Sequence, residues 1–403
     1  GKIEAWHNVM SLYRTNDFVT YDTATDYSFY QLFYGCTSLT KAPALPATTL
    51  AQYCYSDMFR DCTALTKAPA LPATTLAPKC YANMFNGCAL LTKAPALPAT
   101  ALADYCYQNM FRDCISLVNA PALPATTLAQ SCYSSMFFGC TSLTKAPALP
   151  ATTLATSCYL GMFYGCTSLS EAPALTATTL APKCYTNMFG GCTSLTKAPA
   201  LPATTLAQEC YQFMFQVCTS LTKSPELTAT TLAQSCYSNM FNGCSSLNKV
   251  RCEIPSSYSS NNISSYASNW LYHVSSTGTF YTNADANWPS GSSGIPTGWT
   301  RVPAVDDITK PLTFRATQDG STVKLTKNGS PTGAFQTSND GGNTWEDYTI
   351  DTAITLNTDD EVSFRAKADR TSAQSDQSYF KFMMEGKFEA WHNVMSLYRT
   401  NDF

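Results

Sequence analysis

Charged residues and histidines are scarce in this chain of 403 residues. Only 13% of the residues are Asp, Glu, Lys or Arg, and the formal net charge at pH 7 is −3. A nucleic-acid-binding domain needs a basic surface, so this composition argues against a nucleic-acid partner. The sequence also has no run of about 20 apolar residues, which a membrane-spanning helix would require.

The chain also lacks the side-chain sets that catalysis requires. It has three histidines, and two of them, His7 and His392, occupy the same place in a repeated segment, which leaves His273. No pair of carboxylates recurs beside an aromatic groove, as glycoside hydrolysis would need. The cysteines have no regular basic or histidine neighbour to activate them as nucleophiles. We expect no enzymatic activity, no catalytic residue and no cofactor site.

Cysteine is abundant, with 18 residues arranged in two ladders. One ladder runs from Cys36 to Cys244 and the other from Cys54 to Cys236, while Cys252 stands apart. Small buried apolar residues are one interpretation, because free cysteine is among the most buried residue types. Disulfides within some coils are the alternative. A zinc site is disfavoured, because the C-x7-C spacing and the few histidines do not match zinc motifs.

The ladders mark a repeat with a period of 26 residues, which predicts a solenoid of stacked coils. The segment Cys54–Cys62 has apolar residues at helical spacing, so we expect a short helix there, with Ser56, Asp57 and the Arg60–Asp61 pair facing solvent. The following stretch, Leu39–Pro46 in the first coil, contains two prolines and predicts a parallel strand of at most three or four residues. The predicted class is an α/β repeat solenoid.

The repeat frame F-x-G-C-T-S-L-T-x-A-P-x-L-P-A-T-x-L resembles the BspA-type leucine-rich repeats of bacterial surface proteins. The stretch Ser276–Trp299 is similar to the tail that follows such repeats. The resemblance covers roughly residues 27–300. It implies a right-handed leucine-rich solenoid in a surface, adhesin-like or phage-fibre-like protein, located outside the cell, on the cell surface or on a virion.

We divide the chain into five parts. Residues 1–26 form an N-terminal cap, residues 27–255 the solenoid, and residues 256–303 a C-terminal cap whose tryptophans need burial. Residues 304–385 form a small all-β sandwich, Ig-like in the loose sense, and residues 386–403 begin a further repeat unit. The sandwich is predicted from turn signals and six expected strands: Leu312–Ala316, Thr322–Leu325, Ala334–Thr337, Ala353–Leu356, Val362–Ala366 and Tyr379–Met383.

One motif lies within the predicted sandwich. It matches S-x-D-x-G-x-T-W and consists of Ser338, Asp340, Gly342, Thr344 and Trp345. The pattern resembles the Asp-box of sialidase propellers. The resemblance implies a structural β-hairpin, in which the Asp and Ser bond the turn backbone and the Trp packs beneath, and it implies no catalysis.

Two surface features are candidate ligand-binding elements. Stacked coils would place one lysine column about 5 Å apart, namely Lys41, Lys67, Lys93, Lys145, Lys197 and Lys223. This column could bind anionic glycans, or it could be a solvated edge that resists sheet pairing. The face that varies between repeats carries Phe138, Leu160 and Phe213, which we expect to be exposed and which favour a contact surface.

The largest repeat spans the whole chain. Gly1–Phe18 returns at Gly386–Phe403, with Ile3 replaced by Phe388 as the only difference. A tandem structural fibre is the first hypothesis, with copies of the chain as partners, joined covalently or by docking between subunits. The expected junction residues are Trp6, Val9, Met10 and Leu12 and their counterparts Trp391, Val394, Met395 and Leu397.

The alternative hypothesis is a monomeric cell-surface adhesin. It would bind a glycan or a host-surface protein through the variable face of the solenoid.

Overall fold

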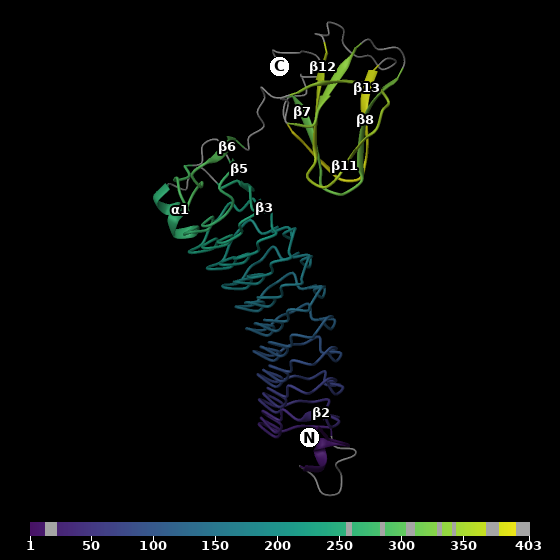
Figure 1. Ribbon diagram of the computed structural model, residues 1–403, viewed down its shortest axis with the longest axis vertical. Coiled ribbons are helices and arrows are strands. Elements are labelled where there is room, and N and C mark those ends of the chain that lie inside the picture. The colour runs from purple at the N-terminus through teal and green to yellow at the C-terminus, as the bar shows by residue number, and fades with distance from the viewer. Residues whose placement is uncertain are drawn as a thin grey trace. The chain divides into compact units, whose positions relative to one another are not determined.

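The computed structural model describes residues 1–12, 22–254, 260–282, 287–303, 311–328, 333–340, 344–367 and 379–391. The chain divides into two compact units, Gly1–Val302 and Pro303–Phe403. The first unit consists mainly of parallel coils of 26 residues, which we call the coil stack (Figure 1). The second is an antiparallel β structure, which we call the β unit. In the described part of the chain, no helix has the length and apolar character needed to cross a membrane.

The predicted short helices in the coils are absent, and overlapping turns take their place. In the coil around Cys54–Cys62, the N–H groups of Ser56 and Met58 bond to carbonyls three residues earlier. The N–H groups that alternate with these bond to the next coil: Tyr55 N–H donates to Cys80 O at 3.0 Å, and Asp57 N–H donates to Ala82 O at 2.8 Å. The helix prediction was wrong because these bonds between coils use donors that an α-helix would need for its own i−4 carbonyls.

Left-handed backbone at every fourth residue produces this chain of turns. Tyr53, Asp57 and Asp61 have φ values of 56°, 54° and 59°. A positive φ at the third residue of alternate turns matches type II geometry. Asp and Asn tolerate this conformation better than most residues, and Gly tolerates it best. Glycine occupies this turn position in several other coils, as at Gly87, which precedes Cys88 and has a φ of 75°.

The proline-rich side of each coil forms almost no regular sheet. Successive coils meet there at single β-bridges, such as Lys41 with Lys67 and Thr49 with Thr75. Longer pairing occurs only near the two ends of the described stack, where β2 (Leu39–Lys41) pairs with β1 (Ile3–Glu4), and β3 (Lys223–Leu227) pairs with β4 (Lys249–Cys252). Proline lacks an N–H donor, which accounts for the broken ladder.

Aligned side-chain ladders fill the core of the coil stack. Tyr81 stacks on Tyr107 with ring centroids 5.8 Å apart, and Phe85 stacks on Phe111 at 5.6 Å. The cysteines are free thiols and all are buried except Cys36, which is exposed in the first coil. Identical residues at 26-residue spacing meet their own counterparts, so each column packs against itself.

Both ends of the coil stack are covered by other elements. At the N-terminal end, β1 pairs with β2, and the 3₁₀-helix η1 (Val9–Leu12) buries Val9 and Met10. At the other end lie α1 (Ser260–Tyr266), β5 (Gly278–Thr282) and β6 (Trp299–Pro303), in a sheet of order β3-β4-β5-β6. Trp270 is fully buried there, and its indole N–H donates to Gly294 O at 3.1 Å.

The β unit contains two antiparallel sheets, with orders β10-β9-β12-β7-β14 and β11-β8-β13. Phe314, Val323 and Phe364, which come from both sheets, share one apolar core. The six expected strands correspond to six observed strands with bounds shifted by up to three residues: β7 (Leu312–Ala316), β8 (Ser321–Asn328), β9 (Phe335–Ser338), β11 (Ile354–Leu356), β12 (Glu361–Ala366) and β13 (Tyr379–Glu385).

Two further strands were not expected. They are β10 (Glu346–Tyr348) and β14 (Phe388–Trp391). Because β14 pairs with β7, the boundary drawn at residue 385 is corrected: the second copy of the repeated segment supplies an edge strand of the β unit.

Candidate functional site

The lysine column lies where the single β-bridges hold adjacent coils together. Lys41, Lys67, Lys93, Lys145 and Lys197 are exposed, whereas Lys223 is half-buried in β3. The column is interrupted by Asn119 and Glu171, and both of these residues take part in the same series of bridges. It is therefore a weakly basic stripe, because Glu171 places an acidic group between Lys145 and Lys197.

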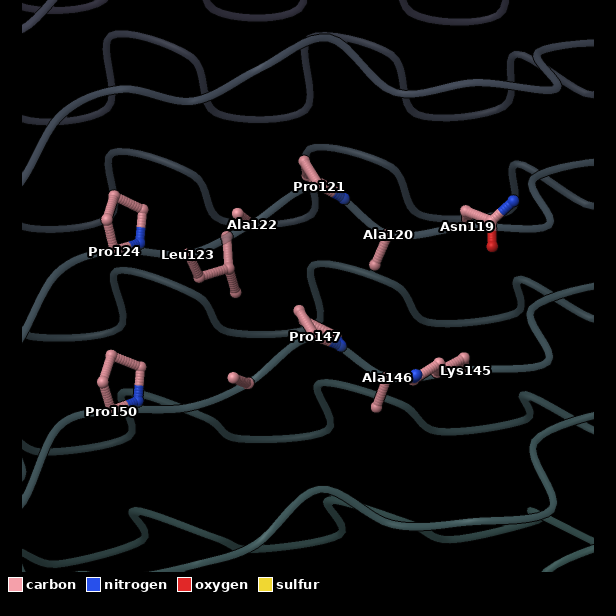
Figure 2. A pocket seen from close by; sticks show the side chains of 11 residues that line it. Asn119, Ala120, Pro121, Ala122, Leu123, Pro124, Lys145, Ala146, Pro147 and Pro150 are labelled. Atoms are coloured by element: carbon pink, nitrogen blue, oxygen red, sulfur yellow. The ribbon is translucent and has the colours of Figure 1, made fainter.

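Open apolar hollows adjoin this stripe. One of about 600 Å³ lies between two coils and is lined by Asn119–Pro124 and by the corresponding residues of the next coil, Lys145–Ala148 and Pro150 (Figure 2). A second hollow of about 560 Å³ repeats the arrangement one coil further on, with Glu171 at its edge. Alanine and proline side chains line both hollows, which suits contact with an apolar or ring-shaped ligand face better than acid–base chemistry.

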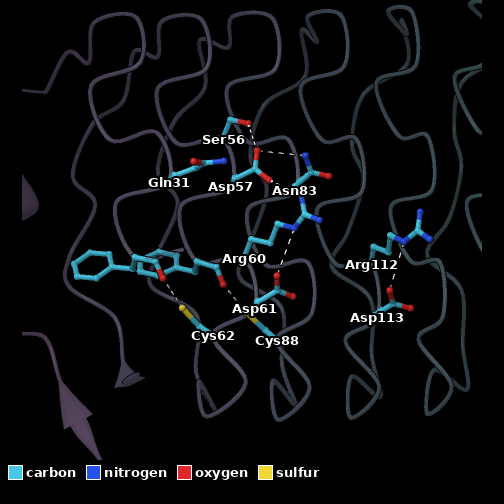
Figure 3. A network of polar contacts seen from close by, with 12 residues as sticks. Gln31, Ser56, Asp57, Arg60, Asp61, Cys62, Asn83, Cys88, Arg112 and Asp113 are labelled. Carbon is cyan, nitrogen blue, oxygen red and sulfur yellow. Dashed lines mark hydrogen bonds and ion pairs between the residues drawn. The ribbon is translucent and has the colours of Figure 1, made fainter. Parts of the chain in front are cut away.

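The turn side of the coils differs from expectation. Ser56 and Asp57, which were predicted to face solvent, are only 2% and 6% exposed. Ser56 Oγ donates to Asp57 Oδ2 at 2.9 Å, and Asn83 of the next coil donates to the same oxygen at 3.4 Å (Figure 3). Arg60 also bonds to Asp57, at 3.2 Å. The prediction failed because it assumed a helix, in which Ser56 and Asp57 would lie on the polar face. In the observed chain of turns, the adjacent coils cover both side chains.

The predicted contact residues of the variable face are half-buried, which corrects the expectation of exposure. Phe138 stacks on Tyr164 with centroids 4.6 Å apart, and the Arg112 guanidinium lies 4.1 Å from the Phe138 ring centroid. The backbones of Leu160 and Phe213 also bond to adjacent coils: Leu160 O accepts from Ser135 N–H at 2.7 Å, and Phe213 N–H donates to Ser238 O at 3.0 Å.

A second column on the turn side was missed. Tyr27 stacks on Tyr53 at 4.7 Å, and Lys79 Nζ donates to the Tyr53 hydroxyl at 2.8 Å. That bond is the main cause of a raised pKa of Lys79, whose ammonium also lies 5.3 Å from the Tyr105 ring centroid. Tyr27 is 55% exposed. The sequence did contain a signal for this column: Tyr27, Tyr53, Lys79 and Tyr105 occupy the same position in successive 26-residue repeats.

The two copies of the repeated segment lie in different surroundings. In the first copy, Val9 and Met10 are buried, but Trp6 and Leu12 are 60% and 68% exposed, so these two do not cover the first coil as expected. The ammonium of Lys41 lies over the Trp6 ring, 3.2 Å from its centroid. In the second copy, Trp391 ends β14, and Val394, Met395 and Leu397 lie outside the described residues, as does the Trp391 side chain.

Comparison with protein families decides what the coils are. A family model described as "BspA type Leucine rich repeat region" matches in six copies, over residues 25–170, 79–211 and 161–282. These ranges together cover more than half of the chain. The chain belongs to the BspA-type leucine-rich repeat family. No curated protein and no solved structure matches the chain.

The BspA-type match covers residues 25–282. It therefore includes neither the β unit nor either copy of the repeated segment. In this BspA-type protein the Asp-box residues lie at the turn between β9 and β10, which pair antiparallel. Thr344 N–H and Oγ1 donate to the Asp340 carboxylate at 3.0 and 2.6 Å, and Ser338 Oγ donates to Asp340 Oδ1 at 2.7 Å. Arg365 covers the half-buried Trp345 ring at 4.1 Å, and Gly342 lies outside the described residues.

The thiols of this BspA-type repeat are poor nucleophiles. Burial raises the pKa of Cys54, Cys184 and Cys236 to about 12, against a usual value of 9.0. Within the described residues, no group of three His, Cys, Asp or Glu side chains is arranged to hold a metal ion.

Proposed function

We propose that the chain is a structural unit of an extracellular or virion-attached fibre, in which a leucine-rich solenoid alternates with a β-sandwich spacer. In this proposal the coil stack is the solenoid and the β unit is the Ig-like sandwich. The partners are further copies of the same unit. The surface location is the one typical of proteins with BspA-type repeats.

The observation that carries the proposal is the repeated segment. Residues 1–18 and 386–403 differ at one position, and the described parts of the two copies lie on the two different units. A monomer has no evident need for two nearly identical segments on separate folds. A fibre uses such a segment once per repeat, because each copy follows one unit and precedes the next.

Negative-stain electron microscopy of the native material tests this function. Filaments with a regular axial period on the order of 100 Å, from coil spacing and domain size, are expected. Discrete short particles at the same protein concentration would overturn the fibre. The image should be taken without added glycan or host protein, because a fibre assembles without either.

The exposed aromatic column favours a second candidate function, that of an adhesin. Tyr27 and Tyr30 are 55% and 41% exposed and contact each other edge to face. Tyr27 stacks on Tyr53, whose hydroxyl accepts from Lys79, and exposed rings such as Tyr27 and Tyr30 offer apolar faces and hydroxyl groups to a glycan. Saturable binding on a glycan array, lost in Tyr27→Ser and retained in Lys249→Ala, an exposed residue of β4 far along the stack, would support it.

A further inference from the structure

The free edge of β14 follows from its pairing with β7. Among the described strands, β14 is the last of its sheet, and Phe388 pairs with Ala316 while Glu389 pairs with Arg315. Lys387 O accepts from Thr317 N–H at 2.9 Å, which makes residue 387 a hydrogen-bonded position of this antiparallel pair.

Hydrogen-bonded and non-bonded positions alternate in such a pair. Residues 389 and 391 therefore direct their backbone groups toward β7, as does the carbonyl of residue 387, whose N–H donates to Ser321 Oγ at 3.2 Å. Phe388 and Ala390 direct theirs toward the open edge of the sheet.

The first copy of the segment uses the opposite set of backbone groups. Ile3 N–H donates to Ser38 O at 2.8 Å, and Ala5 N–H donates to Lys41 O at 2.9 Å. Ile3 O also accepts from Thr40 Oγ1 at 3.0 Å. Ile3 and Ala5 correspond to Phe388 and Ala390. The edge that binds the first coil in one copy is thus the edge that β14 leaves open in the other.

The side chains agree with this division of the strand. Phe388 is half-buried and packs against the core of the β unit, whereas Ile3 is 60% exposed. The two copies differ only at this position, and the larger apolar side chain, Phe388, is in the copy that packs against a core. On the opposite face, Glu389 pairs with Arg315, whose side chain is only 5% exposed. Neither side-chain interaction uses the backbone groups of Phe388 and Ala390, whose counterparts Ile3 and Ala5 bond to the first coil.

We propose that one copy of the segment serves two sheets at once. Residues 387–391 pair antiparallel with β7 along one edge. Along the other edge they pair parallel with the first coil, residues 38–41, of a second copy of the coil stack. The result is a mixed sheet, which is common in proteins. The inference rests on the proposed fibre and specifies how successive units are connected. The connection is a shared strand and not a flexible linker.

A second coil stack is the occupant that the observations favour. Its first coil already binds this same sequence through the groups that β14 leaves open, with Ser38 O and Lys41 O as acceptors. An exposed strand edge otherwise favours uncontrolled pairing with other chains. Covering it with the next unit removes that hazard and fixes the orientation of the two units.

The test uses a two-unit chain, in which residues 1–403 are followed by a second copy of residues 19–403. The final copy carries Met384→Leu, at a residue 48% exposed on β13, so that its peptides differ in mass from those of the junction. Amide hydrogen exchange is then read residue by residue. At the junction, the N–H groups of Phe388 and Ala390 are expected to exchange at least about tenfold more slowly than in the final copy. Equal rates would overturn the proposal.

Two proline variants at the junction give matched controls, since proline removes a single backbone N–H and with it one hydrogen bond of the strand pair on that side. Ala390→Pro removes only the donor aimed at the second coil stack, so protection at Phe388 should fall while Glu389 stays slow. Glu389→Pro removes the donor aimed at β7 and should loosen that pairing instead. Unchanged exchange at Phe388 in Ala390→Pro would also overturn the shared strand.

The two proposals fail separately. Filaments of native protein whose Phe388 and Ala390 amides exchange freely would exclude the shared strand and leave the fibre. A protected junction in the two-unit chain, with no filaments from the native material, would exclude the fibre and leave the shared strand.

Discussion

The thiol of Cys114 donates a hydrogen bond to the carbonyl oxygen of Phe85, 3.1 Å away in the preceding coil. The same pairing recurs 29 residues apart through the ladder, as in Cys88 with Phe59 and Cys140 with Phe111. From Cys62 onward, the residues of this ladder are therefore donors between coils as well as small buried side chains.

Replacing this cysteine by alanine and by serine separates the two roles. Cys114→Ala should lower the free energy of unfolding by about 1–2 kcal/mol, through the lost donor and a small cavity. Cys114→Ser should cost less, because its hydroxyl can donate to the same carbonyl. Urea unfolding followed by circular dichroism measures both. A larger loss for serine than for alanine would show that the thiol acts only as an apolar filler.

Alkaline pH should unfold the coil stack. Burial raises the pKa of thiols such as Cys184 and Cys192 to about 12, while an unfolded thiol keeps a pKa near 9.0. Between these values the folded state binds more protons than the unfolded state, so the free energy of unfolding falls as pH rises. The loss is about 1.4 kcal/mol per thiol for each pH unit.

With many such thiols, cooperative unfolding is expected between pH 9 and 11, measured by circular dichroism in the presence of a reductant. The β unit provides an internal control, because the sequence has no cysteine after Cys252. Its amides should remain protected from exchange where the stack has unfolded. A stack still folded at equilibrium at pH 11 would contradict the prediction.

Val217→Gly should stabilise the protein. Val217 has φ 59° at a turn position where six other coils have glycine. The left-handed conformation costs a residue with a Cβ about 1–2 kcal/mol, of which glycine's greater freedom in the unfolded chain offsets about 0.5–1 kcal/mol. Thermal unfolding should show a net gain of up to about 1 kcal/mol.

The reverse change at an equivalent position is the control. Gly139→Val should destabilise the stack, because Gly139 has φ +70° and an added Cβ would lie 2.2 Å from Asp113 Oδ1. A gain in stability from Gly139→Val, or a loss from Val217→Gly, would mean that the turns do not require this conformation.

Asp340→Ala should loosen the hairpin of β9 and β10 without affecting the coil stack. It removes the acceptor of the bonds from Ser338 Oγ and from Thr344 N–H and Oγ1, at a cost of about 1 kcal/mol to the β unit. Hydrogen exchange of the β9 and β10 amides should quicken. Asp347→Ala on the same hairpin is the comparison, since Asp347 is exposed and pairs with Lys367, and it should have a smaller effect. Equal effects of the two changes would remove the structural role of the motif.

The sequence alone determined the period and the alignment of the columns. Because the spacing of 26 residues is regular, every residue was known to lie next to its counterpart, and burial of both cysteine ladders followed from their apolar neighbours. The strand Leu312–Ala316 was predicted with its observed bounds, since short-range alternation and turn residues define an antiparallel strand locally.

Tertiary structure decided which backbone groups pair. The apolar spacing of Cys54, Met58 and Cys62 suits a helix and a chain of turns equally well. The choice was made by carbonyls such as Cys80 O, 25 residues beyond the Tyr55 N–H that bonds to it. The repeated segment shows the same effect: Ile3–Glu4 joins a coil, whereas Phe388–Trp391 joins β7. Strand pairing satisfies backbone donors with whichever partner the fold brings close, and one local sequence therefore takes part in two different sheets.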